Sequence, residues 1–248
     1  MKIVVFTAIF GNIDMVYPNV PNALGKAAWV CFTDKPRHES GLWSYDGIGE
    51  YPTLIAPGSR QITAPTWKQE IVDAEYGNRM TARYYKTTPH RYFPDADVSI
   101  WVDGNVRLLV PPERLIKQYL PKGVDFATFA HPDRKCLYEE ARVCMANGKG
   151  KKSDIQAQIE FYQKEGIRQQ GGLYETKCVI RRHTEATENA NELWWQQICD
   201  FSVRDQISLP YVLKNSNATV SSIPGRVALS NWPGDRNPEF WTAKHVKK

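Results

Sequence analysis

Short apolar runs without polar alternation mark the expected strands of this chain. Residues 2–8 and 28–33 place β-branched and apolar side chains at successive positions, and residues 97–101 do the same. Continuous runs of this kind are typical of strands buried on both faces of a parallel sheet, whereas a strand with one solvated face alternates. Further strands are expected at residues 51–56, 125–130 and 178–181.

Longer segments with helical character separate these runs. The first is predicted over residues 66–87, where Pro65 is positioned to open it, and Pro112 lies at the start of another over residues 112–120. Because strands alternate with helices, the pattern favours an α/β fold with a mostly parallel central sheet flanked by helices. Further helices are expected at residues 137–147, 153–165, 188–201 and 204–213.

The length of 248 residues fits one domain over residues 1–248, with an irregular Pro-, Gly- and Trp-rich tail from about residue 224. No apolar stretch approaches the ~20 residues needed to span a bilayer, and the N-terminal run is too short for a signal sequence. We therefore expect a soluble, cytoplasmic protein without a membrane span. Five widely spaced cysteines without a CxxC pair are expected to be reduced thiols.

The charge of the chain limits the classes of ligand that we expect it to bind. The chain has 32 basic and 27 acidic residues, a formal charge of +5. This excess is too small and too scattered for a nucleic-acid partner, which requires a clustered basic stripe, but it suits a pocket for a nucleotide diphosphate. No GxGxxG, GxxxxGK[ST] or GxSxG pattern occurs, so a Rossmann dinucleotide site, a P-loop and a hydrolase elbow are not indicated.

The first candidate for chemistry is the sequence Asp103-Gly104-Asn105. It follows a predicted buried strand, at the edge of the sheet where open α/β folds bind their ligands. Asp103 and Asn105 both offer oxygen atoms, which Mg²⁺ and Mn²⁺ prefer. Asp-Gly and Gly-Asn are also common turn dipeptides, and the spacing alone does not separate a metal site from a turn.

A second candidate lies on the first predicted helix, where Arg79, Arg83 and Lys86 align on one face. Such a face could hold a diphosphate, or it could be the solvated side of an amphipathic helix. A third candidate is the polar segment of residues 202–208, in which Ser202 and Asp205 resemble a capping box. Capping does not account for Arg204 and Gln206. Five histidines complete the candidates: His38, His90, His131, His183 and His245.

Together these segments resemble a glycosyltransferase-like family whose plant members act in mucilage and cell-wall biosynthesis. The resemblance extends from about residue 6 to residue 211, and the order of the motifs is specific. The matching motifs are Arg83-Tyr84-Tyr85-Lys86, residues 89–94, residues 99–105, His131 with Arg134, residues 138–141, residues 158–162, residues 172–175, residues 193–195 and residues 204–208.

The resemblance implies a GT-A-type fold, distantly similar to glycogenin-like and lipopolysaccharide-galactosyltransferase-like enzymes. By this likeness Asp103 binds Mn²⁺ or Mg²⁺ and the ribose, Asn105 takes the second position of an Asp-x-Asp motif, and His245 is a third metal ligand. Asp205 and Gln206 would lie beside the transferred sugar as catalytic residues. Asp205 would orient the sugar or the acceptor hydroxyl, and it could also act as a base or as a transient nucleophile. Asn105 departs from the motif, since an amide binds a metal less tightly than a carboxylate does.

The resulting hypothesis is a glycosyltransferase that uses a nucleotide-diphosphate sugar, with UDP favoured, and a glycan acceptor. The base and ribose would lie at the end of the first strand, at Thr7, Ala8, Phe10 and Gly11. The remaining assignments are as follows: Arg79, Arg83, Lys86, Gly104 and Arg204 bind the donor, and His131 and Glu175 are reserve candidates for acceptor contact or proton transfer.

Two other functional hypotheses remain open at this point. A nucleotidyltransferase that builds nucleotide sugars would need a glycine-rich basic loop after the first strand, and residues 10–14 are not one. A non-catalytic sugar- or nucleotide-binding module would keep the fold without the chemistry, and the amide of Asn105 is its best support.

Overall fold

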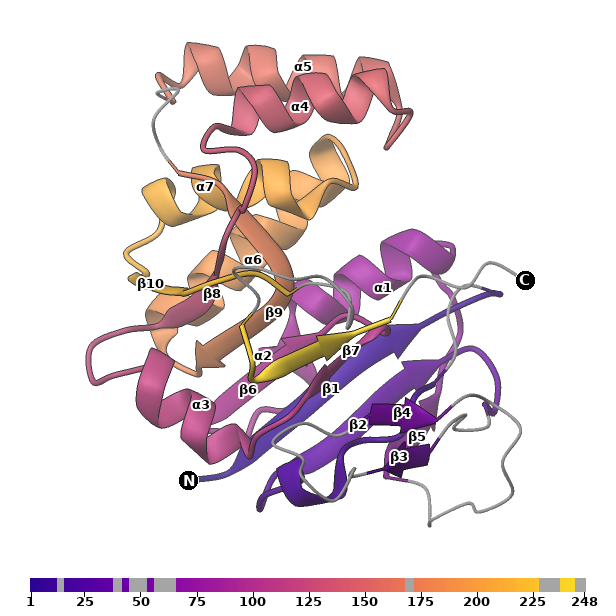
Figure 1. The fold of residues 1–248 in the computed structure, drawn as a ribbon. Coiled ribbons are helices and arrows are strands. Elements are labelled where there is room, and N and C mark those ends of the chain that lie inside the picture. Colours follow the sequence, from indigo (N-terminus) through magenta and orange to yellow (C-terminus); the bar gives the residue numbers. More distant parts are fainter. Residues whose placement is uncertain are drawn as a thin grey trace.

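A seven-stranded sheet forms the centre of the protein (Figure 1), with the strand order β10-β8-β9-β6-β1-β2-β5. The computed structural model describes residues 1–12, 16–37, 66–167, 172–227 and 237–243, and the backbone of 42–44 and 53–55. The strands of this sheet are β1 (Ile3–Ile9), β2 (Ala28–Thr33), β5 (Lys68–Ile71), β6 (Val98–Val102), β8 (Phe126–Ala130), β9 (Tyr174–Arg182) and β10 (Val220–Ile223).

Most neighbouring strands run parallel. β1 pairs in parallel with both β2 and β6, and β2 pairs in parallel with β5. β9 reverses direction and pairs antiparallel with β6 on one side and β8 on the other. β10 then pairs in parallel with β8. The predicted α/β class with a mostly parallel sheet is confirmed.

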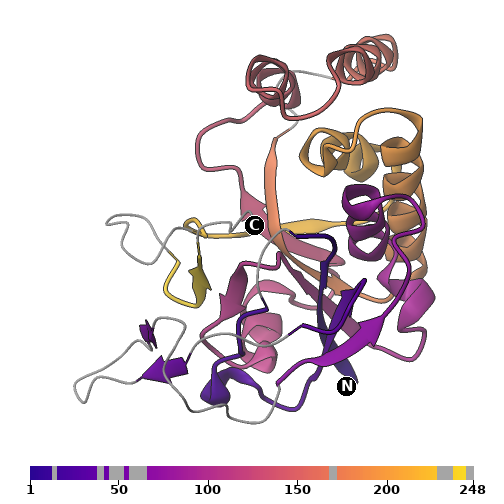
Figure 2. The same cartoon turned by 90° about the vertical axis from the view of Figure 1, so that its right-hand side faces the viewer.

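Helices cover both faces of the sheet because the strands are apolar on both. On β1, Val5 and Ile9 pack into a core that also contains residues of α3, whereas Phe6 packs into a second core with residues of α6. Figure 2 shows α1, α6 and α7 together on one side. The helices are α1 (Asn78–Thr87), α2 (Pro89–Tyr92), α3 (Pro112–Tyr119), α4 (Leu137–Ala146), α5 (Lys152–Lys164), α6 (Glu185–Asp200) and α7 (Asp205–Asn215), with a 3-10 turn at Pro21–Ala23.

α4 and α5 form a further layer above α7 (Figure 1). Leu137 and Ala141 of α4, Ile155 of α5 and Ile207 of α7 share a third apolar cluster. Because residues 131–136 lead from the end of β8 directly into α4, this layer lies next to the carboxyl edge of the sheet.

The helix predicted over residues 66–87 is wrong in its first half. Lys68–Ile71 is strand β5, and the helix begins only at Asn78, after Gly77 at φ +76°. β5 pairs only with β2 in this sheet, so its partly exposed positions carry polar side chains that also suit an exposed helix. The strand expected at residues 51–56 is present as β4 (Thr53–Ile55), in a separate antiparallel pair with β3 (Leu42–Ser44).

The C-terminal tail contributes one strand that the sequence did not predict. β11 (Phe240–Thr242) pairs antiparallel with β7 (Val106–Leu108), directly after the Asp103-Gly104-Asn105 sequence. The other tail residues from 228 to 236 and from 244 onward lie outside the described residues. Within the part of the chain that the structure describes, no helix is long and apolar enough to cross a membrane.

Candidate functional site

Asp103 stands at the carboxyl end of β6, as the sequence predicts. Its backbone amide donates to the Lys177 carbonyl of β9 at 2.8 Å, which fixes the main chain there. The Trp101 indole Nε1 donates to Asp103 Oδ1 at 2.8 Å, so this oxygen is oriented toward the sheet. The side chain keeps 25% of its surface exposed, and a ligand can therefore reach it.

Lys86 is buried beside Asp103 rather than displayed on a solvated helix face. Its side chain is 1% exposed, and its ammonium lies 2.6 Å from Asp205 Oδ2, 3.1 Å from Thr176 Oγ1 and 3.4 Å from Asp103 Oδ1. It also lies 5.4 Å from the centre of the Trp101 ring. A buried charge is tolerated when it is paired and hydrogen-bonded, and Lys86 meets both conditions.

Asp205 is the anion at the centre of this network. It is the first residue of α7, its side chain is 3% exposed, and its Oδ1 lies 3.4 Å from the Arg83 guanidinium. Burial by itself would raise the pKa of Asp205, but Arg83, Lys86 and Arg204 outweigh burial and hold the pKa well below its usual range. Asp205 is therefore a permanent anion at any pH near neutrality.

An irregularity in β9 brings the third member of the network into place. The pairing of β8 with β9 shifts between Thr128 and Phe129, so residues 176–178 have no partner on β8. The Thr128 hydroxyl lies 3.2 Å from the Glu175 carbonyl and 2.8 Å from the Cys178 carbonyl, within donating distance of both. In this bulge the Thr176 hydroxyl donates to Asp205 Oδ2 at 2.7 Å. Thr176 was not predicted from the sequence, because no residue pattern near it indicates a β-bulge.

A second buried carboxylate, Glu140 of α4, lies on the other side of Arg204. Its Oε2 is 2.7 Å from Arg134 Nε, and its Oε1 is 3.4 Å from the Arg204 guanidinium. His131 Nε2 lies 3.9 Å from the same carboxylate. Burial and the neighbouring Arg134 guanidinium lower the pKa of His131, so its imidazole is neutral at pH 7. Glu140 thus connects the α4–α5 layer to the site.

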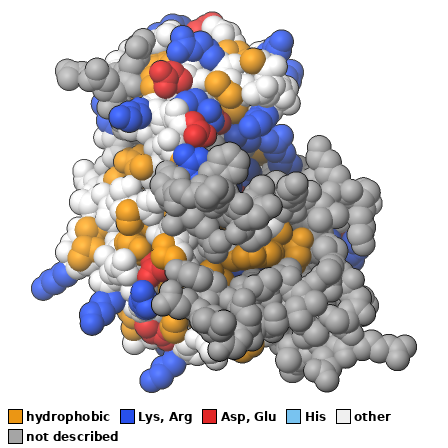
Figure 3. Space-filling view, in the orientation of Figure 1, with side chains coloured by type: hydrophobic (Ala, Val, Ile, Leu, Met, Phe, Trp, Pro, Cys, Tyr) orange, Lys and Arg blue, Asp and Glu red, His pale blue; other side chains and the backbone are white. Residues whose placement is uncertain are grey.

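Cations outnumber carboxylates around this edge of the sheet. Arg79 lies at the surface. Partial burial, and then the positive charges of Arg83 and Arg204, lower the pKa of Arg79. Figure 3 shows Lys and Arg side chains concentrated at the level of α4, α5 and α7. The basic groups are Arg79, Arg83, Lys86, Arg134 and Arg204, and the acidic groups are Asp103, Glu140 and Asp205. This surplus of positive charge suits an anionic ligand.

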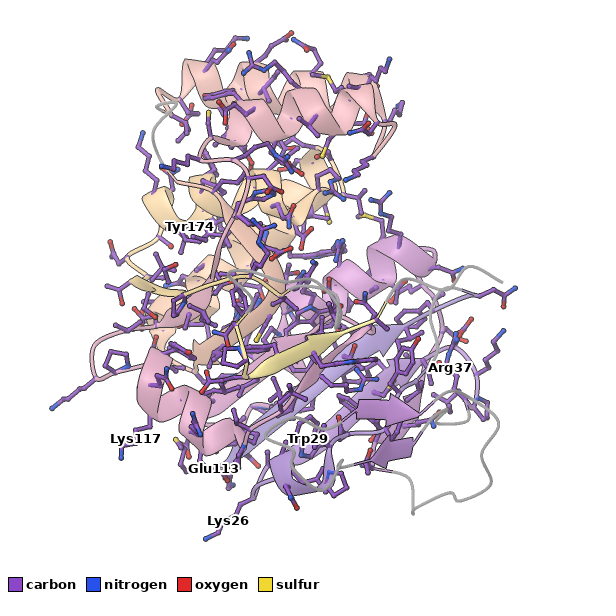
Figure 4. All side chains as sticks on the ribbon, in the orientation of Figure 1. Lys26, Trp29, Arg37, Glu113, Lys117 and Tyr174 are labelled. Carbon is purple, nitrogen blue, oxygen red and sulfur yellow. The ribbon has the colours of Figure 1, made fainter. Side chains whose placement is uncertain are left out.

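Two further predicted residues flank the network. The Gln206 side chain is half-buried and makes no hydrogen bond with any described residue, so its amide is available to a ligand. Glu175 is 8% exposed, and its Oε1 accepts from Lys177 Nζ at 2.7 Å. Its Oε2 is buried and has no partner among the described residues. Tyr174, the first residue of β9, is labelled in Figure 4.

The predicted base and ribose residues lie at the end of β1. Thr7 and Ala8 are buried, and the Thr7 hydroxyl has no hydrogen-bond partner among the described side chains and backbone. Phe10 stacks on Tyr85 of α1 with ring centres 6.0 Å apart. Gly11, at φ +67°, packs so closely on Asn78 that a Cβ would come within 2.4 Å of Asn78 Nδ2.

A polar latch closes the ends of β1 and β2. The Gly11 amide donates to Asp34 Oδ2 at 2.9 Å, and Arg37 donates to both the Gly11 carbonyl at 2.6 Å and Asp34 Oδ1 at 2.8 Å. Burial would raise the pKa of Asp34, but these hydrogen bonds outweigh it and lower the pKa. Arg37, labelled in Figure 4, lies at the side of the molecule near β2.

The predicted metal ligands are only partly within the described residues. Asn105 is 3% exposed; its Nδ2 donates to the Ala243 carbonyl at 2.7 Å, and its Oδ1 is buried without a partner among the described residues. An orphaned amide oxygen beside Asp103 fits a hard cation that takes its remaining ligands from substrate phosphates. No group of three or more His, Cys, Asp or Glu side chains suited to a metal occurs in the described part of the chain, and His245 lies outside it. The Gly104 carbonyl accepts from Arg107 at 3.2 Å.

The proposed capping role of Ser202 is wrong. Arg204 is the residue before the first turn of α7, and no side chain caps that helix. The Ser202 hydroxyl donates instead to Gln158 Oε1 of α5 at 2.5 Å. The polar segment is therefore explained by contacts with α5 and with the buried ion network, not by a capping box.

The arrangement is that of an open α/β protein, a class in which ligands bind at the carboxyl edge of the sheet, where the candidate residues of this chain lie. Comparison with known families is more specific. The model of the TOD1/MUCI70 glycosyltransferase-like domain matches residues 1–223, and the chain belongs to this family. The resemblance inferred from the motifs is confirmed.

Two relatives come from Arabidopsis thaliana. The probable hexosyltransferase MUCI70 is 30% identical over 143 residues, which cover 54% of this chain and 25% of that protein. The alkaline ceramidase TOD1 is 29% identical over 144 residues, which cover 53% of this chain and 30% of that protein. The matched part is thus less than a third of either relative's length.

Similar solved structures include two glycosyltransferases. Mouse xyloside xylosyltransferase 1, in its apo form, has a TM-score of 0.41 at 10% identity, with 66% of this chain and 63% of that chain covered. The apo WbbM bifunctional glycosyltransferase has a TM-score of 0.47 at 9% identity, with 90% and 38% covered. Both likenesses are distant.

Proposed function

We propose that this chain is a glycosyltransferase domain of the GT-A type, which moves a sugar from a nucleotide-diphosphate donor, with UDP favoured, to a hydroxyl group of a glycan acceptor. Membership of a glycosyltransferase-like family supports the reaction class. The observation that carries the proposal is the accessible Asp103 carboxylate within a surplus of basic side chains at the carboxyl edge of the sheet.

The basic side chains suit the negative charge of the donor. Arg79 is exposed and Arg83 is 18% exposed, so both can approach a diphosphate from the open side of the network. Charge that develops on the leaving nucleotide is stabilised best by fixed cations in a site of low polarity. Arg204 is held in place by Glu140 and contributes to the same positive potential.

A divalent cation fits the oxygen atoms of Asp103 and Asn105. When bound, Mn²⁺ or Mg²⁺ would offset the charge of the diphosphate. Both protein ligands are fixed independently of the metal, Asp103 by Trp101 and Asn105 by Ala243, so they would need little rearrangement.

Asp205 suits an orienting role better than a proton-transfer role. Its two oxygens are already engaged by Arg83, Lys86 and Thr176, and its low pKa makes it a weak base. Glu175, which has one oxygen without a partner among the described residues, is a better candidate to accept the proton of the acceptor hydroxyl. Neutral His131 is the second candidate, although its ring nitrogens already contact the Arg134 guanidinium and two backbone amides. Gln206 would contact the transferred sugar.

The test is thermal unfolding of the protein with a panel of nucleoside diphosphates and nucleotide sugars, with and without MnCl₂. A ligand at about 100 times its dissociation constant adds about 2.7 kcal/mol of stability. We expect a shift with one nucleotide that is lost in Asp103→Ala and kept in Asp95→Ala, whose side chain is exposed and away from the site. No shift with any nucleotide would overturn the donor site.

Turnover separates the proposal from its alternatives. Release of nucleoside diphosphate from a nucleotide sugar supports a transferase, whereas binding without turnover would favour a binding module. Because one relative is named an alkaline ceramidase, ceramide hydrolysis is measured in parallel. Fatty-acid release from ceramide that survives Asp103→Ala, without use of any nucleotide sugar, would contradict the proposal.

A further inference from the structure

The hydroxyl of Thr176 lies between two charged groups, Lys86 and Asp205, and neither the sequence pattern nor membership of the family assigns it a role. Thr176 is 1% exposed and belongs to the part of β9 that has no partner on β8. From there it contacts Asp205 Oδ2 at 2.7 Å and Lys86 Nζ at 3.1 Å. A buried hydroxyl between an ammonium and a carboxylate is in hydrogen-bond contact with both.

The direction of each hydrogen bond follows from the groups involved. An ammonium only donates and an ionised carboxylate only accepts, so the Thr176 hydroxyl must accept from Lys86 and donate to Asp205. The order of hydrogens is therefore fixed. This series of hydrogen bonds holds Lys86, Thr176 and Asp205 in place and does not transfer a proton between them.

The distances show how these hydrogen bonds position the Lys86 ammonium. Two of its ammonium contacts are short, at 2.6 Å to Asp205 and 3.1 Å to Thr176, and the third, to Asp103, is longer at 3.4 Å. Asp103 Oδ1 has its closer partner in Trp101, at 2.8 Å. Lys86 thus stays near Asp103 without forming a tight ion pair with it.

We propose that Thr176 is a positioning residue that keeps the Lys86 ammonium from pairing closely with Asp103, so that the Asp103 carboxylate stays available to the donor. The proposal rests on the proposed donor site at Asp103. Without the hydroxyl, one N–H of Lys86 loses its acceptor in a buried region, and Asp103 is the nearest replacement. A close Lys86–Asp103 pair would then compete with the donor for the carboxylate.

The test compares Thr176→Val, which removes the hydroxyl at nearly constant volume, with Thr176→Ser, which keeps it. Binding of UDP in the presence of MnCl₂ is measured by calorimetry. We expect about tenfold weaker binding for Thr176→Val and recovery to within about twofold for Thr176→Ser, in line with the loss of one hydrogen bond to charged groups. The control is Thr187→Val, a fully buried threonine of α6 whose hydroxyl lies 3.0 Å from the Thr184 hydroxyl.

Binding to Thr176→Val that equals binding to the unchanged protein would overturn the proposal, as would an equal loss in Thr187→Val. Crystal structures of the unchanged protein and of Thr176→Val give a second readout that needs no ligand. We expect Lys86 Nζ to approach Asp103 Oδ1 more closely in the variant than the 3.4 Å of the unchanged protein, and an unmoved Lys86 would contradict the inference. If the unchanged protein binds no UDP, the donor proposal fails, and the position of Lys86 still decides the role of Thr176.

Discussion

At the scale of single residues, the site depends on charges that are buried together. Lys86 and Asp205 are 1% and 3% exposed, and each would be costly to bury alone. Their contact at 2.6 Å, with Arg83 and Thr176 beside them, explains why α1 and α7 can place opposite charges in the interior. A change that removes either Lys86 or Asp205 leaves the other buried without its closest oppositely charged partner.

Asp205→Asn tests this coupling through the pH dependence of stability. The pKa of Asp205 is lower in the folded protein than in the unfolded chain, where it is near 3.8. The stabilisation is therefore fully present above pH 5 and is lost as the pH falls below the unfolded value. At pH 7 we expect Asp205→Asn to lower the free energy of unfolding by about 3 kcal/mol, because Lys86 loses its partner.

Between pH 5 and pH 3 the same variant should lose less stability than the unchanged protein does. Urea unfolding at pH 7, 5, 4 and 3 measures both effects. Asp95→Asn is the control, since the Asp95 side chain is 87% exposed and should leave the pH profile unchanged. Parallel pH profiles for Asp205→Asn and the unchanged protein would show that folding does not lower the pKa of Asp205.

At the scale of elements, tight contacts between segment ends shape the site. Gly11, at the end of β1, approaches Asn78 at the start of α1, and the Asp34–Arg37 latch ties β1 to β2. The β9 bulge makes a comparable tight contact with β6, because the Asp103 amide donates to the Lys177 carbonyl. The site is thus built where strands end or lose their regular pairing.

Gly11→Ala tests the close approach of β1 and α1. A Cβ at this position meets Asn78 Nδ2 at 2.4 Å and also requires φ +67°, so two costs add. We expect a loss of about 2 to 3 kcal/mol in the free energy of unfolding, against about 1 kcal/mol for Gly123→Ala, where φ is +83° and no atom lies within 4 Å. Adding Asn78→Ala to Gly11→Ala should recover the steric part alone. Equal losses for Gly11→Ala and Gly123→Ala, measured by urea unfolding, would refute the packing argument.

At the scale of the whole molecule, the sheet and the α4–α5 layer together focus positive charge on one edge. The net charge is only +5, but Arg79, Arg83, Arg134 and Arg204 gather where β6, β8 and α7 meet. At the opposite end of the molecule the Lys26 backbone amide donates to Glu113 Oε1 at 2.7 Å, a surface hydrogen bond far from this cluster (Figure 4).

Salt should therefore weaken nucleotide binding. The Debye length falls from about 10 Å at 0.1 M to about 3 Å at 1 M ionic strength, so exposed cations lose most of their attraction for a diphosphate. We expect UDP affinity, measured by calorimetry, to fall about tenfold over this range, with a shallower dependence in Arg79→Gln. Lys117→Gln, on exposed α3 surface away from the site (Figure 4), should keep the full dependence. A salt-independent affinity would argue against a role for these cations.

The sequence by itself determined the class of fold and the edge of the sheet at which the candidate residues lie. Continuous apolar runs identified β1, β2, β6 and β8 because strands buried on both faces leave no polar positions. Asp103 could be placed at the end of β6 for the same reason. β5 was missed because its exposed positions resemble those of a helix, and β11 was missed because its three residues pair only through a distant segment. The single domain and the cytoplasmic location stay predictions.

Only the tertiary structure decided how the candidate residues meet. Helical spacing placed Arg79, Arg83 and Lys86 on one face, but it could not show that Lys86 is buried against Asp205, which lies 119 positions further along the chain. Thr176 carries no local signal, since a bulge arises from the register of two strands rather than from the residue itself. Sequence patterns report local spacing and burial, whereas the pairing of buried charges depends on contacts between distant segments, which form only when the chain folds.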